Sequence, residues 1–305
     1  MQRFDGRMSR LTYFSEMKLP LSLFFILAVI FSHSQPGTEI LLFDIKMENK
    51  QLIFSGPVNI TNHKGYDNQP YFHPTLPYIY YSSFNDSGRS DIKVYNYKTK
   101  ETSHLTLTNE REYSPVVTPD EKYISCIIQR DNGAQDLGKY PINTGEPEIL
   151  ISHLKVGYHA WASKNTVLLF VLDDSSNTLH LYNLANKTDK VLATNIGRSL
   201  HKIPGEEAMS FVQNISATIN QIRKIDLATG VISPVTYTIP GQEHMTWLQK
   251  NILLMGKETG LYLYDTQLQE GWQPVIIEAD ASLVKGITRL AVNKTMTKLA
   301  VVVSE

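Results

Sequence analysis

The sequence predicts an all-β fold, a six-bladed β-propeller with four-stranded blades. A strand-like pattern that ends in a bulky residue, usually followed by Asp or Asn, occurs six times; its copies end at Asp44, Asn96, Pro141, Asn183, Asp226 and Asp265. A second pattern opens on a large residue every 42 to 45 residues, at Tyr71, Val116, Trp161, Ile203, Trp247 and Leu290. β-type units that repeat at this period are typical of propeller blades.

The two patterns are out of phase at the ends of the repeat. The first pattern begins before the second, and the second ends after the first. We therefore expect the N-terminal segment to supply the outer strands of a blade whose inner strands come from the C-terminus. Such pairing would close the ring, because it leaves no unpaired strand edge where the repeat starts and stops.

Composition supports one large β domain over residues 35–305. The 305 residues are 42% hydrophobic and 10% aromatic, which is enough for a sizeable core of pleated, half-buried strands. A formal net charge of −1 gives no electrostatic footprint for nucleic acid. The single cysteine, Cys126, shares a strand face with Ile124 and Ile128, so we expect a buried thiol and no disulfide.

The first 34 residues have the features of a secretory signal peptide. An apolar run from Leu19 to Phe31 follows Lys18 and is too short to span a bilayer comfortably. Cleavage is expected after Ser34, and residues 1–16 are interpreted either as an extended n-region or as a segment upstream of a start at Met17. The sequence therefore predicts an exported protein, periplasmic or extracellular, with no membrane span after cleavage.

The first two complete units carry the clearest motifs. Each opens on a Pro-containing segment of the inner strand, at 69–74 and 114–120, and continues into expected second strands at 78–84 and 123–129. Turn-forming residues follow at 85–88 and 131–133. The segment SPVVTPDEKYISCIIQRDNGAQDLGKYPINTGEPEIL resembles the WD40-like repeat of TolB-type propellers, and QPYFHPTLPYIYYSSFNDSGRSDIKVYNYKTKETSHLTLT is similar to it.

This resemblance covers residues 38–305 as architecture and residues 66–150 as specific motifs. TolB-like repeats occur in periplasmic proteins that bind other envelope proteins, and in propellers fused to prolyl-oligopeptidase-type hydrolases. The chain resembles the propeller alone, without the N-terminal α/β domain of TolB. It contains no Gly-x-Ser-x-Gly nucleophile elbow, so the resemblance does not extend to a peptidase domain.

Polar residues near the starts of the inner strands are expected to converge at one mouth of the propeller. The candidate ligand-binding residues are Asp67, Gln69, Glu112, Ser114, His159, His201, Glu243 and His244. The simplest interpretation is an ordinary polar channel lining. Imidazole and carboxylate groups together also suit a divalent metal, which leaves a metal site as an alternative. Trp161 and Trp247 are interpreted as packing between blades rather than as stacking platforms for a ligand.

From these observations we expect an exported, non-catalytic binding or scaffolding module that recognises a protein or a small ligand at the mouth. The expected partner is an envelope or secreted protein, with no cofactor and no catalytic residue assigned. One alternative is a metal-dependent hydrolase or lactonase that uses the same axis. The other is an accessory subunit of a separately encoded envelope enzyme.

Overall fold

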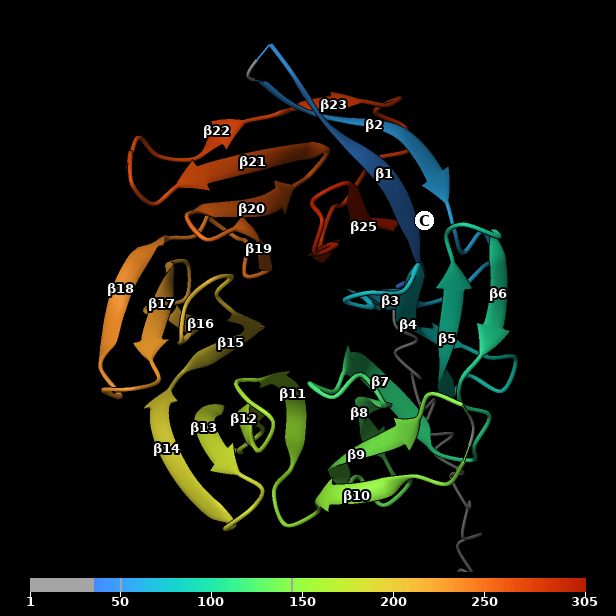
Figure 1. Cartoon of the computed structure of the whole chain (residues 1–305), viewed down its shortest axis with the longest axis vertical. Coiled ribbons are helices and arrows are strands. Elements are labelled where there is room, and N and C mark those ends of the chain that lie inside the picture. Colours follow the sequence, from blue (N-terminus) through green and yellow to red (C-terminus); the bar gives the residue numbers. More distant parts are fainter. Residues whose placement is uncertain (1–35, 50, 144) are drawn as a thin grey trace, which may run out of the picture. The chain divides into compact units, whose positions relative to one another are not determined.

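The predicted six-bladed propeller is confirmed. A computed structural model describes residues 36–49, 51–143 and 145–305, and in this part of the chain six β-sheets are arranged as a ring (Figure 1). None of the described residues forms a helix, so no described helix could cross a membrane. The expected signal peptide, residues 1–34, lies outside the described residues.

Five blades are built from consecutive strands. Blade 1 contains β3 (Asp67–Phe72), β4 (Tyr78–Phe84), β5 (Ser90–Asn96) and β6 (Glu101–His104), and blade 2 contains β7 (Arg111–Val117), β8 (Tyr123–Gln129), β9 (Gln135–Pro141) and β10 (Glu148–Ile151). Blade 3 contains β11 (Val156–Trp161), β12 (Thr166–Val171), β13 (Thr178–Asn183) and β14 (Thr188–Thr194). Blade 4 contains β15 (Ile196–Lys202), β16 (Ala208–Asn214), β17 (Asn220–Asp226) and β18 (Ile232–Tyr237). Blade 5 contains β19 (Met245–Gln249), β20 (Ile252–Lys257), β21 (Gly260–Asp265) and β22 (Gln273–Pro274).

Blade 6 closes the ring with strands from both ends of the repeat, as the sequence predicts. Its inner strands are β24 (Leu290–Val292) and β25 (Lys298–Ser304), and its outer strands are β1 (Thr38–Glu48) and β2 (Gln51–Asn59). β1 pairs antiparallel with β25 from Thr38 opposite Ser304 to Asp44 opposite Lys298. A feature that the sequence does not predict is β23 (Ile276–Glu278), which pairs in parallel with β2 and gives this sheet a fifth strand.

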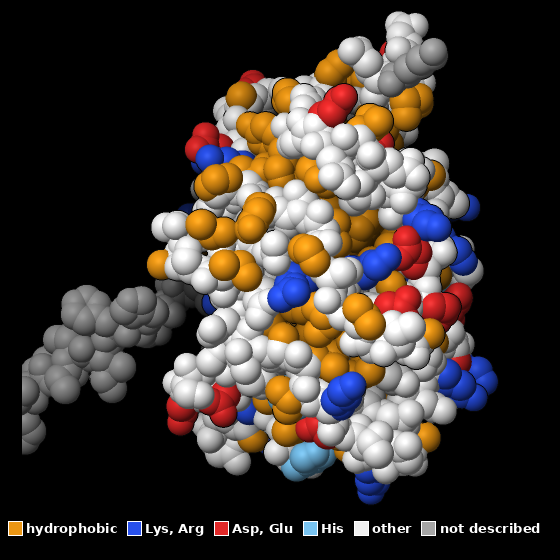
Figure 2. Space-filling model, turned by 90° about the vertical axis from the view of Figure 1, so that its left-hand side faces the viewer, with side chains coloured by type: hydrophobic (Ala, Val, Ile, Leu, Met, Phe, Trp, Pro, Cys, Tyr) orange, Lys and Arg blue, Asp and Glu red, His pale blue; other side chains and the backbone are white. Residues whose placement is uncertain are grey.

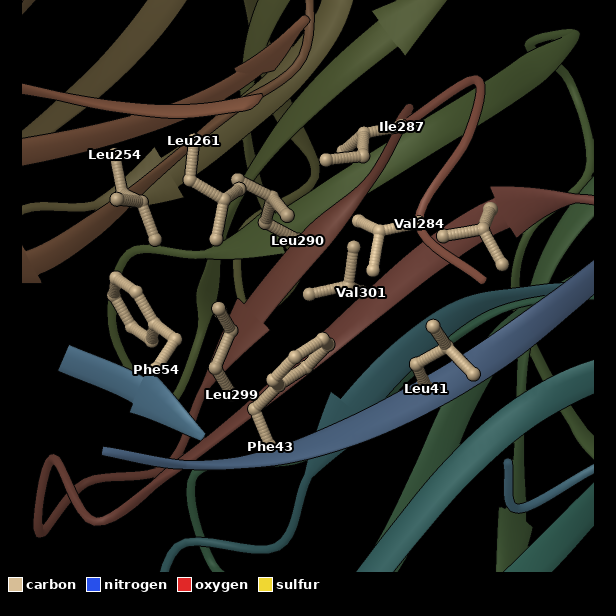
Figure 3. Close-up of a cluster of buried hydrophobic side chains, with 11 residues drawn as sticks. Leu41, Phe43, Phe54, Leu254, Leu261, Val284, Ile287, Leu290, Leu299 and Val301 are labelled. Carbon is tan, nitrogen blue, oxygen red and sulfur yellow. The ribbon is translucent and has the colours of Figure 1, made fainter. Parts of the chain in front are cut away.

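The hydrophobic core is divided into clusters between neighbouring blades. The cluster at the closing seam joins Phe43 and Phe54 of the N-terminal strands to Leu254 of blade 5 and to Leu299 of β25 (Figure 3). All four side chains are fully buried. The expected burial of the Cys126 thiol is confirmed in the cluster between blades 1 and 2.

The outer strands place some apolar side chains at the surface. Along the perimeter that contains β14 and β18, hydrophobic atoms appear in patches between polar and charged side chains (Figure 2). Val191 on β14 and Tyr237 on β18 are 56% and 57% exposed. Scattered exposure of this kind is normal for a folded protein and marks no particular site.

The inner strands begin earlier than the Pro-containing motifs indicate. β3 starts at Asp67 and β7 at Arg111, and both are interrupted by a bulge where the pairing register shifts. At the bulges, Gln69 and Ser114 have positive φ angles of 59° and 55°, and a proline follows each. A bulge adds a residue to one strand, so it changes which side chains face the channel.

Candidate functional site

The axis of the ring holds three adjoining cavities that share lining residues. The polar mouth, at the starts of the inner strands, has a volume of about 540 Å³ and is lined by residues that include Asn68, Tyr158, Arg198 and Arg289. The waist, about 120 Å³, shares Tyr158, Arg198 and Arg289 with the mouth. The apolar bowl, about 550 Å³, lies at the far ends of the inner strands. The waist therefore joins two chemically different chambers.

The structure brings five of the eight predicted site residues together at the waist. These residues are Gln69, Ser114, His159, His201 and His244. Gln69 is held in place because its Oε1 accepts hydrogen bonds from Ser82 Oγ at 2.8 Å and from the backbone N–H of Ser114 at 2.7 Å. Glu243 lies beside the waist, with its carboxylate 3.7 Å from Arg198 Nε and 3.6 Å from His244 Nε2.

Asp67 and Glu112 do not line the channel, so their predicted placement at the mouth is wrong. Both side chains are buried, and their neighbours Asn68 and Tyr113 line the polar mouth instead. The reason is the alternation of side chains along a strand, which exchanges the faces when the register is displaced by one residue.

The buried carboxyl groups of Asp67 and Glu112 contact other side chains of the protein. The Asp67 carboxylate lies 3.2 Å from His63 Nε2, and burial raises the pKa of Asp67 to about 6 despite the opposing effects of Ser83 and His63. Glu112 accepts hydrogen bonds from Thr108 Oγ1 at 2.6 Å and from Tyr140 OH at 3.0 Å. Burial also raises the pKa of Glu112. Both carboxyl groups therefore lie in the interior of the protein and not against the channel.

The three waist histidines are neutral near pH 7. Burial lowers the pKa of His159 to about 3 and that of His201 to about 4. Burial also lowers the pKa of His244 well below its usual value, and the positive charges of Arg289 and Arg198 add to this effect. His159 Nε2 lies 2.7 Å from Ser125 Oγ, and His201 Nε2 lies 3.1 Å from Ser199 Oγ. His159 and His201 therefore act as neutral hydrogen-bonding groups.

The geometry does not favour a metal at this axis. Within residues 36–305, apart from the two positions left undescribed, no group of three His, Cys, Asp or Glu side chains is arranged to hold a metal ion. Asp67 and Glu112 lie outside the channel, so Glu243, 3.6 Å from His244 Nε2, is the one carboxylate of the predicted set near the waist histidines.

Sequence reasoning missed Arg289, which spans the channel. Arg289 directly precedes β24 of blade 6, and its guanidinium donates to Asn68 Oδ1 of blade 1 at 3.1 Å and to Tyr158 OH of blade 3 at 3.0 Å. The guanidinium carbon also lies 5.5 Å from the centre of the Tyr158 ring, within the range of a cation–π contact. Arg198 of β15 lines the same mouth and was also missed.

The recurring large residue of each repeat forms a ring around the apolar bowl. All six positions line this cavity: Tyr71, Val116, Trp161, Ile203, Trp247 and Leu290. The two tryptophans also pack against clusters between blades, as predicted. Their indole N–H groups donate to serines of the preceding blades, with Trp161 Nε1 2.9 Å from Ser125 Oγ and Trp247 Nε1 2.8 Å from Ser210 Oγ. One repeat position thus serves both the core and the channel wall.

Comparison with solved structures confirms the expected resemblance in fold. A putative TolB from Agrobacterium tumefaciens superimposes with a TM-score of 0.65 at 10% identity, over 89% of this chain and 99% of that one. TolB from Acinetobacter baumannii gives a TM-score of 0.58 at 14% identity, over 78% of this chain and 65% of that one. The fold is that of a TolB-like β-propeller. The chain therefore spans just under two thirds of the length of the A. baumannii protein.

An enzyme shares the same fold. An oligogalacturonate lyase in complex with manganese gives a TM-score of 0.55 at 13% identity, over 82% of this chain and 80% of that one. No protein-family model matches the sequence. No curated protein matches it either. Identities of this size establish the fold alone, because one propeller fold carries many functions.

Proposed function

We propose that this chain is an exported, non-catalytic β-propeller that binds an envelope or secreted partner protein at the polar mouth. The observation that carries the proposal is the mouth itself, an opening of about 540 Å³ lined by polar, aromatic and arginine side chains. Rigid strands fix the positions of these groups, and such preorganisation lowers the entropic cost of binding. A concave opening with a few well-placed polar groups is typical of ligand pockets, and the mouth offers the same geometry to a protruding segment of a partner.

A binding role agrees better with the channel chemistry than hydrolysis does. The carboxyl groups of Asp67 and Glu112 lie outside the channel, and burial lowers the pKa of His159 to about 3. A general acid or base works best with a pKa near the working pH, which this histidine does not have. The fold shared with an oligogalacturonate lyase is the argument for an enzyme, and it concerns the scaffold only.

Site-specific photo-crosslinking tests the proposed mouth. A photoreactive amino acid replaces Asn177, which lines the polar mouth, and in a matched control it replaces Val231, which is 60% exposed on the perimeter. In cells that naturally make the protein, we expect a discrete protein adduct from position 177 and none from position 231. Absence of an adduct from position 177, or the same adduct from both positions, would overturn the proposal.

Export is tested on the protein isolated from the same cells. We expect the mature chain to begin near Gln35 and to occur in the periplasmic or extracellular fraction, because the segment before it has signal-peptide features. A cytoplasmic protein that retains Leu19–Phe31 would contradict this part of the proposal.

A further inference from the structure

Arg289 carries a positive charge in the channel that no described acidic side chain neutralises. Its two hydrogen-bond acceptors, the Asn68 amide oxygen and the Tyr158 hydroxyl, are both neutral groups. Among the described residues, no Asp or Glu forms an ion pair with Arg289 or with Arg223, whereas Arg89, Arg111, Arg130 and Arg198 all have such partners. A half-buried charge without a counter-charge is costly, so this position favours an anion from outside the chain.

The guanidinium of Arg289 retains donors for such an anion. A guanidinium has five N–H groups in one plane, and the contacts to Asn68 and Tyr158 occupy one on each terminal nitrogen. These contacts come from blades 1 and 3, so they fix the plane of the guanidinium across the channel. A planar fork held in this way matches the two oxygens of a carboxylate.

The remaining charges at the polar mouth have the same sign. Among the described residues that line it, Arg198 and Arg289 are the charged side chains, and none is Asp or Glu. Arg198 is 56% exposed, and the Glu243 carboxylate lies 3.7 Å from it, outside the residues that line the mouth. An opening lined by one sign of charge raises the local concentration of ligands of the opposite sign.

Thr288 provides a second unpaired polar group at the same place. Its Oγ1 is buried, has no hydrogen-bond partner among the described groups, and belongs to a residue that lines the polar mouth next to Arg289. Buried hydroxyls are usually satisfied, so an unpaired one beside Arg289 adds to the hydrogen-bonding capacity that the chain itself leaves unused at this part of the mouth.

We infer that Arg289 binds a carboxylate presented by an acidic polypeptide segment in the polar mouth, with Asn68 and Tyr158 as positioning residues. This inference rests on the proposed function, since it names the group by which the partner is recognised. The volume of the mouth, about 540 Å³, accommodates several side chains, whereas the waist below Arg289 holds only about 120 Å³. The segment therefore stops at Arg289 and does not thread the ring.

Fluorescence anisotropy with two labelled hexapeptides tests the inference on the purified full chain. The acidic probe is Gly-Gly-Asp-Glu-Asp-Gly, and the neutral probe is Gly-Gly-Asn-Gln-Asn-Gly. We expect the acidic probe to bind at least about tenfold more tightly, and the Arg289→Gln variant to lose this preference. Lys46→Gln removes an exposed positive charge from β1, outside the channel, and as a matched control it should keep the preference.

A second variant and a competition measurement complete the test. Tyr158→Phe removes one acceptor that orients the guanidinium and should weaken the acidic probe several-fold, which gives a second readout if Arg289→Gln does not fold. Glutarate should displace the labelled peptide only at concentrations far above those at which the unlabelled peptide does so. Displacement at equal concentrations would overturn the inference of a polypeptide segment and identify a small acid as the ligand. Equal binding of both probes to the unmodified chain would overturn the inference. Persistence of the position-177 crosslink would then show that the proposed function survives without it.

Discussion

Replacement of Phe43 by Ala measures how much the closing seam contributes to the stability of the ring. The Phe43 side chain is fully buried between blades 5 and 6 (Figure 3). At about 25 cal/mol per Å², an aromatic ring that buries roughly 150 Å² contributes about 4 kcal/mol. Because truncation also leaves a cavity, Phe43→Ala should lower the free energy of unfolding by about 3 to 5 kcal/mol.

Urea denaturation, followed by tryptophan fluorescence and by circular dichroism, gives this quantity if both signals change together. Met47→Ala is the control on the same strand, since Met47 is 67% exposed, and its effect should stay within about 0.5 kcal/mol. Phe211→Ala truncates an equally buried ring between blades 3 and 4 and should cost a similar amount. A loss below about 1 kcal/mol for Phe43→Ala alone would refute the reasoning, because the seam would then not belong to the cooperative core.

Three further predictions concern buried polar groups. Ser210→Ala leaves the Trp247 indole N–H unpaired and should cost roughly 1 to 3 kcal/mol in urea denaturation, against little change for Ser233→Ala. For His201, the folded pKa of about 4 lies below the usual 6.5, so the unfolded chain takes up the proton first and the free energy of unfolding falls as the pH drops from 6.5 towards 4. His201→Gln should remove roughly 3 kcal/mol of that loss in urea denaturation. The same pH dependence in this variant and in the unmodified chain would contradict the prediction. For Asp67, the folded pKa of about 6 lies above the usual 3.8, so its carboxylate destabilises the fold above pH 6 and not below pH 4. As the pH rises from 4 to 7, the free energy of unfolding of Asp67→Asn should therefore increase by roughly 3 kcal/mol relative to that of the unmodified chain. A difference between the two chains that stays constant with pH would contradict this assignment to Asp67.

The repeat was sufficient to predict the fold because every blade must place a strand of similar length at the same radius. The large residues at Tyr71, Val116 and Trp161 recur for this reason, and they do line one end of the channel. The phase difference between the two patterns likewise predicted the pairing of β1 with β25. The fifth strand, β23, has only three residues and pairs with a segment far away in the sequence, so no local pattern indicates it.

The candidate site was predicted less accurately because it depends on single-residue register. The residue before a proline normally has an extended conformation, so nothing in the sequence indicates the positive φ of Gln69 and Ser114. The bulges at these residues place Asn68 and Tyr113 in the mouth instead of Asp67 and Glu112.

Arg289 was not predicted because it also lies one residue away from an expected channel position. Thr288, the residue before it, stands two positions before the large residue Leu290, as Gln69 stands before Tyr71, and both Thr288 and Arg289 line the polar mouth. The one signal in the sequence is the charge itself, an arginine directly beside an expected channel position. Its two acceptors, Asn68 and Tyr158, come from other blades, so their contacts with it depend on the closed ring.

Closure of the ring by β1 and β25 also affects the order in which the protein is able to fold. The side chains of Asp44 and Lys298, which meet at this seam, are 254 residues apart in the sequence. Blades 1 to 5 need only neighbouring strands, whereas blade 6 pairs the first two described strands with β25, which is synthesised after all the other described strands. Contacts between such distant segments form slowly, because the entropy of a very long loop must be overcome first. We therefore expect β1 and β2 to lack their partner strand while blades 1 to 5 assemble, and the pairing of β1 with β25 to form after those blades.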